Sequence, residues 1–418
     1  MHRLSESIRL VFRNRDFPGL LAANFALGMG YSFVVPFMSM WGTLKVQMSP
    51  VVFGTFMTIT AISSVVLSTV LARWSDTHVT RRTMLILGSA GGMIGYVGYA
   101  YLTNPVALTI VGSLGLGLAS VNLSQIFAHV REEFDRPENP SKAGDVPFLM
   151  SLVRVSFSLA WTVGPAIGAA VMHHFSYRGI FLGAASLFLV FLFGVLVFVP
   201  NRPHPPIVHT AAREPMLRVL TRGDILLSFA AFVIVFAAHS INLMNLPLLI
   251  TEQLGGTEKE VGYVFVVAPF AEMPLIIWAG RAAARGHMMA LLRIGAATTV
   301  IYFLCLLFVR ASWHIYPMQI LSAISIAILT NITIPFFQEL LPGQAGLATS
   351  LFTNSFNAGN LLGYFVFGLV VDHVGHRGMF GVCSALAAFT TITLLIYRHR
   401  PPPSLSAGLP ARAIGIAH

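Results

Sequence analysis

Arg154 and Glu272 are charged side chains within apolar stretches of this 418-residue chain, where charge is costly and therefore informative. Arg154 offers five hydrogen-bond donors that deprotonation cannot remove. It needs an anion, a set of carbonyl groups or the oxygens of a ligand, so it indicates either ligand binding or pairing with another helix. Glu272 is the one carboxylate clearly inside an apolar stretch of the second half. It could gain and lose a proton there, or stay neutral in a hydrogen bond between helices.

A histidine and a tryptophan extend this set. His239 competes with Glu272 as a proton carrier, since histidine titrates near physiological pH. A lone membrane histidine can equally be a hydrogen bond between helices. Trp161 follows Arg154 by seven residues, which places both on one face of a helix. Its ring could stack on a ligand ring while its N–H bonds a hydroxyl group, or it could pack against neighbouring helices.

Amide side chains recur in four of the apolar stretches. They are Asn24, then Asn122 and Gln125, then Asn242 and Asn245, and finally Asn354, Asn357 and Asn360. Amides donate and accept hydrogen bonds, which suits a ligand rich in hydroxyl groups, but they also hold membrane helices together. Their concentration in a few stretches predicts a shared polar cavity.

Twelve apolar runs of about 20 residues, each long enough to cross a bilayer, must position these side chains. They lie at 17–40, 50–72, 83–103, 105–128, 147–172, 179–199, 224–248, 260–280, 288–309, 314–337, 346–371 and 379–397. Charged residues make up 10% of the chain, where a soluble domain carries about 25%. We therefore predict an all-α membrane protein with twelve transmembrane helices.

The runs form two sets of six, so we expect two halves joined by a polar linker. The predicted parts are a first half at 1–200, a cytoplasmic linker at 201–223, a second half at 224–400 and a disordered tail at 401–418. Residues 151–181 and 350–380 align without a gap at an offset of 199 residues, with ten identical positions. Such an internal repeat is typical of secondary transporters. Within the first copy, Gly164 and Pro165 should loosen the helix at mid-depth and assist gating.

Positive charge predicts the orientation. If the helices alternate, 20 of the 26 Lys and Arg residues fall on the side that holds both termini. The positive-inside rule then places both termini in the cytoplasm. The net charge of +10 thus reflects topology, and we expect no nucleic acid partner.

The loop between the second and third runs carries Asp76, Arg81 and Arg82. These charges could latch adjacent helices together, or they could only set topology. The loop resembles the signature of the major facilitator superfamily between its helices 2 and 3, whose usual form is Gly-x-x-x-Asp-Arg-x-Gly-Arg-Arg. Ala72 and Val79 stand at the glycine positions, and the arginines are displaced by one.

Four stretches, at 125–132, 152–165, 271–274 and 337–346, resemble the bacterial sugar efflux transporter family more narrowly. The resemblance implies the major facilitator fold and proton-linked export of sugars, glycosides or related small molecules. We expect a monomer in the bacterial inner membrane. The alternatives are a drug or metabolite exporter without sugar preference and, from another class, a membrane enzyme that uses His239. The loops are too short to supply an enzyme's other groups. We expect no cofactor and no metal.

Overall fold

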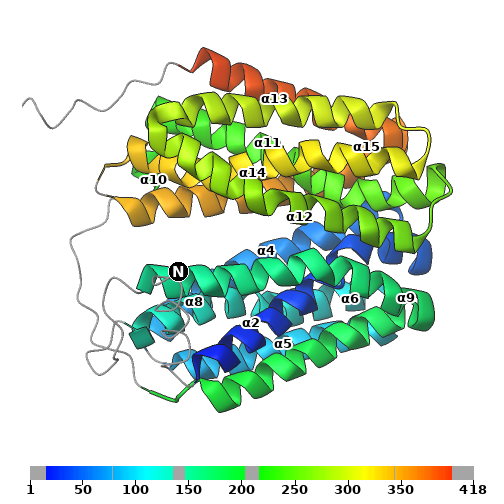
Figure 1. Ribbon diagram of the computed structural model, residues 1–418. Coiled ribbons are helices and arrows are strands. Elements are labelled where there is room, and N and C mark those ends of the chain that lie inside the picture. The colour runs from blue at the N-terminus through cyan, green and yellow to red at the C-terminus, as the bar shows by residue number, and fades with distance from the viewer. Residues whose placement is uncertain (1–15, 78, 135–145, 203–215, 343, 398–418) are drawn as a thin grey trace, which may run out of the picture.

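The computed structural model describes residues 16–77, 79–134, 146–202, 216–342 and 344–397, and this part of the chain is helical with no strand. In its first half the helices are α2 (Phe17–Ser32), α3 (Met38–Met40), α4 (Pro50–Thr77), α5 (Arg81–Tyr101), α6 (Pro105–Val111), α7 (Gly117–Ala119), α8 (Val121–Phe134) and α9 (Val146–Phe198). In the second half they are α10 (Met216–Val219), α11 (Gly223–Leu248), α12 (Glu258–Ala282), α13 (Met288–Leu307), α14 (Ile315–Leu340) and α15 (Ala345–Ile396). The predicted all-α membrane architecture is confirmed (Figure 1). The predicted tail at 401–418 lies outside the described residues.

Nine helical segments in the described residues are long and apolar enough to cross a membrane. Three of them hold 50 or 51 residues, and a straight helix of that length would measure about 75 Å, more than twice the hydrocarbon core of a bilayer. Each of the three contains one residue outside the helical region of backbone space. These residues are Ser176 in α9, Gly286 between α12 and α13, and Gly375 in α15. The chain turns back on itself at these points (Figure 1).

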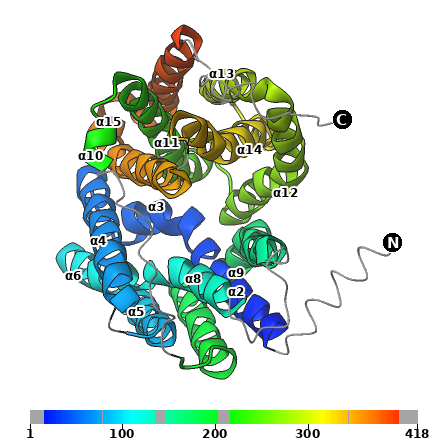
Figure 2. The same ribbon diagram turned by 90° about the vertical axis from the view of Figure 1, so that its left-hand side faces the viewer.

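The helices run between two ends of an elongated bundle. At one end, here called the terminal end, α2 begins and α15 finishes; it is on the left of Figure 1. At the other, the opposite end, α9 and α15 make their turns. Figure 2, viewed from the terminal end, shows the helices arranged in a ring.

Two groups of helices make up this ring. In the first group α2 and α5 pack along α9, and in the second α11 and α13 pack along α15 while α12 packs along α14. Hydrogen bonds reinforce the packing: Asn24 Nδ2 donates to Val153 O at 2.8 Å in the first group. In the second, the hydroxyl of Ser240 donates to Asn360 O at 3.4 Å.

Two close contacts join the groups near the opposite end. A Cβ atom built on Gly54 of α4 would lie 2.7 Å from the Cα of Gly368 in α15. A Cβ atom on Gly262 of α12 would lie 2.9 Å from the carbonyl oxygen of Pro165 in α9. Only a residue without a side chain fits such backbone approaches. The two groups therefore close tightly against each other at the opposite end.

The same helices present exposed side chains toward the terminal end. Arg154 and Ser158 of α9 and Thr353 of α15 are all exposed. A Cβ atom on Gly280, eighteen residues beyond Gly262 on the way to the terminal end, would meet nothing within 4 Å. The groups thus touch at the opposite end, and α12 has open space beside Gly280 toward the terminal end.

Candidate functional site

The first group contributes a polar face on α9. Arg154 precedes Pro165 by eleven residues, or about three helical turns, so it lies on the face that meets α12 at the opposite end. Arg154 and Ser158 are exposed, and Trp161 is half-buried beside Phe157. Among the described residues no hydrogen bond or ion pair engages the Arg154 guanidinium, and the buried Nε1 of Trp161 has no acceptor. This face offers a cation to a ligand between the groups, while the indole N–H of Trp161 is buried.

The second group contributes asparagines on α15. Asn357 precedes Tyr364 by seven residues and Gly368 by eleven, so it shares the face that meets α4. Asn357 and Asn360 are half-buried and Asn354 is exposed. Asn357 therefore lies on the face of α15 that meets α4, and α15 lies across the ring from α9 (Figure 2).

Glu272 is half-buried on α12. It lies on the side of the helix away from Phe270 and Ile277, which are 69% and 54% exposed and mark the outward face. Within the described residues no group bonds its carboxylate. Pro269 and Pro274 flank it, and each removes a backbone donor from the helix, which lets α12 bend there. The carboxylate thus faces the bundle interior on a helix that can flex.

His239 lies deeper in the second group. Its Nε2 atom is 3.2 Å from the hydroxyl of Ser325, and its ring packs on Phe303. One turn further along α11, Asn242 accepts a hydrogen bond at 3.3 Å from the hydroxyl of Tyr302. These contacts stay inside the second group. They match the helix-to-helix role that the sequence left open for His239.

Asn245 forms its hydrogen bonds at the opposite end. Its Nδ2 atom donates to the carbonyl oxygen of His376 at 2.7 Å, and its Oδ1 atom is 2.7 Å from Nδ1 of the same histidine. Nε2 of His376 lies 3.3 Å from a carboxylate oxygen of Glu252. The three side chains tie the end of α11 to the turn of α15, away from the α9 face that carries Arg154.

Two further amides are fully buried in the first group. Asn24 donates to Val153 O and to the hydroxyl of Ser156, so it holds α2 against α9. Asn122 packs on Gly88 of α5, where a Cβ atom would lie 2.3 Å from its Oδ1 atom, and neither of its amide atoms has a partner among the described residues. Both residues face neighbouring helices of their own group, which is the structural alternative for membrane amides.

Gln125 belongs to a polar cluster at the terminal end. Its Nε2 atom donates to the hydroxyl of Ser75 at 3.0 Å, and its Oε1 atom accepts from Arg81 at 3.0 Å. Arg81 also forms an ion pair with Glu132 at 2.8 Å. The cluster links α4, α5 and α8. Sequence reasoning missed Ser75 and Glu132, although Glu132 falls seven residues after Gln125, on the same face of its helix.

The predicted latch is described only in part, because the side chain of Asp76 lies outside the described residues. Arg82 donates to the carbonyl oxygen of Leu196 at 2.8 Å, which fixes the start of α5 to the end of α9. Gly164 packs on Ser32 of α2, and Pro165 meets Gly262 of α12. This pair of residues therefore lies where α9 contacts both its own group and the other one.

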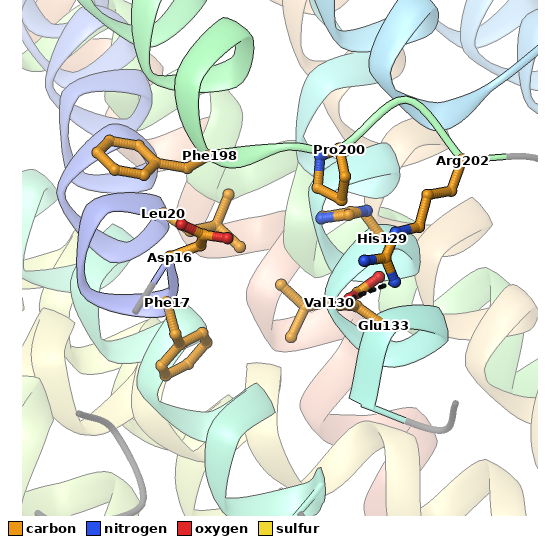
Figure 3. Close-up of a pocket in the computed structure, with 9 residues that line it drawn as sticks. All are labelled: Asp16, Phe17, Leu20, His129, Val130, Glu133, Phe198, Pro200 and Arg202. Carbon is orange, nitrogen blue, oxygen red and sulfur yellow. Dashed lines mark hydrogen bonds and ion pairs between the residues drawn. The ribbon is translucent and has the colours of Figure 1, made fainter. Parts of the chain in front are cut away.

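A small cavity opens at the terminal end, between α2, α8 and the end of α9 (Figure 3). Its volume is about 80 Å³, and it is lined by Asp16, Phe17, Leu20, His129, Val130, Glu133, Phe198, Pro200 and Arg202. Arg202 donates to Glu133 at 3.3 Å across it. Ligand pockets usually measure about 300–1,000 Å³, so this cavity is too small for a sugar-sized substrate. It also lies within the first group and not between the two.

Known proteins resemble the chain over nearly its whole length. The family model of the Major Facilitator Superfamily matches residues 20–249 and 227–417. A putative sugar efflux transporter of Deinococcus radiodurans is 29% identical over 92% of this chain and 98% of its own. Sugar efflux transporter A of Dickeya chrysanthemi is 29% identical over 90% of this chain and 93% of its own. The predicted resemblance to sugar efflux transporters is confirmed.

Solved structures agree on the fold. A mutant of the nucleoside transporter NupG superposes with a TM-score of 0.76 at 14% identity, over 90% of this chain and 98% of that one. A bacterial homologue of the lysosomal transporter Spinster, in an inward-facing and unoccupied conformation, gives a TM-score of 0.68 at 10% identity, over 92% of this chain and 94% of that one. The chain is a multi-pass membrane transporter and not an enzyme, and it belongs to the major facilitator superfamily.

Proposed function

We propose that this protein is a proton-coupled exporter of sugars, glycosides or similar small polar molecules in the bacterial inner membrane. The observation that supports the proposal is the pair of polar faces on α9 and α15, where Arg154 and Ser158 are exposed and Asn357 and Asn360 are half-buried. Sugars present many hydroxyl groups, which arginine and amide side chains can bond. The names of the relatives point to the same class of substrate.

We further propose twelve membrane crossings in two six-helix halves. The three segments of about 50 residues supply two crossings each, since each turns back once. The offset of 199 residues supports the internal repeat. The offset relates Ser176 to Gly375, and both have a positive φ (58° and 70°). It also relates Pro165, whose carbonyl oxygen meets Gly262, to Tyr364, whose carbonyl oxygen meets Gly54. The first group would then be the half at 1–200 and the second the half at 224–400, with residues 201–223 as the linker.

The closed contacts at the opposite end and the open space at the terminal end support alternating access. We assign the terminal end to the cytoplasm, because the positive-inside rule places both termini there. The arrangement is then the inward-open state, in which a cytoplasmic sugar reaches Arg154, Trp161, Asn357 and Asn360. Closure of the terminal end and opening of the Gly54 and Gly262 contacts would release it outside.

The proton would be carried by Glu272. Its carboxylate faces the interior of the bundle and has no partner among the described residues, whereas His239 contacts Ser325 and Phe303. A group that exchanges protons with both sides needs such access. Protons entering down their gradient would drive the sugar outward.

Counterflow in proteoliposomes tests this function. Purified protein is reconstituted in vesicles loaded with one unlabelled sugar at a time, and uptake of the labelled sugar is followed, with and without a pH gradient. Dyes of the kind moved by drug exporters are run in parallel. We expect exchange of at least one sugar or glycoside, and net movement only with the gradient. Movement of dyes but of no sugar would favour the drug exporter.

A further inference from the structure

Arg154 and Glu272 stand on opposite sides of one seam between the two groups. The seam is the line along which α9 faces α12, and Gly262 meets Pro165 and Ala169 at its closed end. Both charged residues lie beyond this contact, toward the terminal end. They are the charged side chains that α9 and α12 carry near the middle of the seam.

The two residues lie at matching depth. Glu272 follows Gly262 by ten residues, which corresponds to about 15 Å along α12. Arg154 precedes Pro165 and Ala169, the two residues that Gly262 meets, by eleven and fifteen residues, which corresponds to about 17–22 Å along α9. The two helices run in opposite directions along the seam. Glu272 after Gly262 and Arg154 before Pro165 therefore both lie toward the terminal end. The difference of about 2–7 Å along the seam is one that a long, extended arginine side chain can span.

Both side chains also face the seam or the interior beside it. Arg154 is three turns from Pro165 and shares its face. Glu272 lies opposite the outward Phe270 and Ile277. Within the described residues neither group has a hydrogen bond or ion pair, so each keeps its bonding capacity free in the state that is open at the terminal end.

We propose that Arg154 and Glu272 form an ion pair across this seam when the terminal end closes, and that the pair stabilises the closed state. This proposal rests on the proposed function, since it presumes that the terminal end closes during transport. Bringing the helices together removes water from two opposite charges, and an arginine can bond a carboxylate through two parallel N–H groups. Leaving either charge unpaired in the closed seam would be costly.

The second seam, between α4 and α15, offers a comparison. The repeat offset places Thr353 of α15 where α9 has Arg154. The residues at this depth on α4 and α15 include Ser68 and Thr353, whose hydroxyl groups bond carbonyls of their own helices. This seam carries no charges at that depth. The closing pair would therefore belong to one side of the ring only.

The test is a double-mutant cycle on Arg154 and Glu272, in which closure is measured at the uncharged seam between α4 and α15. Cysteines replace Ser68 and Thr353, after Cys305 and Cys383 have been changed to alanine, and the rate of their cross-linking by a short thiol reagent reports closure of the terminal end. The measurements use detergent-purified full-length protein without substrate. We compare the parent with Arg154→Gln, Glu272→Gln, the double Gln variant, and the charge-exchanged Arg154→Glu/Glu272→Arg variant. Arg285→Gln is the matched control, because Arg285 is an exposed arginine outside the seam.

Each single Gln substitution should slow cross-linking about tenfold, the size of a typical coupling between sites. The double Gln variant should be no slower than either single one, the charge exchange should restore most of the parent rate, and Arg285→Gln should leave it unchanged. Additive effects of the two Gln substitutions, or no effect of either, would overturn the pair. If one Gln variant does not fold, the charge-exchanged protein still tests the ion pair. If Arg154 and Glu272 act separately, that protein should cross-link slowly.

The outcome is separable from that of the transport assay. Coupling between the residues without sugar counterflow would refute the proposed substrate and keep the pair. Counterflow without coupling would refute the pair and keep the function.

Discussion

At the scale of single residues, the polar side chains fall into two kinds according to their hydrogen-bond partners. Asn24, Gln125 and Asn245 are bonded inside one group of helices, whereas Arg154 and Asn357 face the space between the groups. A side chain whose hydrogen-bonding groups are already paired has fewer of them available to bind a transported ligand. We therefore assign transport to the second kind and stability to the first.

Replacing Glu272 by Gln should abolish sugar accumulation driven by a pH gradient and spare exchange of labelled for unlabelled sugar. The amide keeps the size and hydrogen bonding of the acid but cannot release a proton. The measurement is uptake in proteoliposomes, with and without the gradient. If the variant still accumulates sugar against its gradient, the coupling role passes to His239.

Replacing Arg154 by Lys should weaken sugar binding about tenfold or more, because lysine keeps the charge but loses the planar fork of donors. Isothermal titration of the purified protein with a transported sugar gives the affinity. Arg285→Lys, at an exposed arginine away from the ring interior, serves as the control and should bind normally. Normal affinity of the Arg154 variant would show that only a point charge is needed there.

At the scale of elements, small residues decide how the helices meet. Gly262 allows the backbone of α12 to approach that of α9, and Gly54 does the same for α4 and α15. Gly280, further along toward the terminal end, has open space around it. The same substitution should therefore affect access at Gly262 and leave it unchanged at Gly280.

Gly262→Val should prevent tight closure of the opposite end and raise access from outside, because the new side chain would meet the carbonyl oxygen of Pro165 at 2.9 Å. The measurement uses cells or right-side-out vesicles carrying Thr353→Cys and a membrane-impermeant thiol reagent. Labelling should increase several-fold in the Gly262 variant and stay at the parent level in Gly280→Val. Equal labelling in all three proteins would mean that this contact does not control access.

Arg81→Gln should destabilise the first group by about 1–3 kcal/mol, the usual result of removing one member of a buried polar cluster. Arg81 pairs with Glu132 at side-chain exposures of 13% and 24%. Arg222 pairs with Asp224 at exposures of 50% and 41%, and such surface pairs contribute about 0–1 kcal/mol. Thermal unfolding in detergent should therefore show a clearly lower midpoint for Arg81→Gln than for Arg222→Gln. Equal midpoints would contradict this role of the cluster.

At the scale of the whole molecule, the sequence predicted the all-helical membrane architecture, because hydropathy reports directly on where a chain can meet lipid. It also singled out Arg154 and Glu272, since charge in an apolar run is rare. It could not tell which way each amide points. Asn122 and Asn357 look alike in sequence, yet one packs on Gly88 and the other faces the ring interior. That difference depends on how the helices are packed, as does the choice of which end is closed.

We propose that one polar site between the two groups binds the substrate from the cytoplasmic side. Cysteines at Ser158 of α9 and Thr353 of α15, each in its own single-cysteine protein, test it most directly, because both positions are exposed toward the terminal end and neither is assigned to bind the substrate. A thiol reagent is added to inside-out vesicles, with and without a sugar that passes the counterflow assay. The reagent should label both cysteines, and the sugar should slow both reactions with the same concentration dependence. Protection of only one position, or of neither, would contradict a single site shared by the two groups.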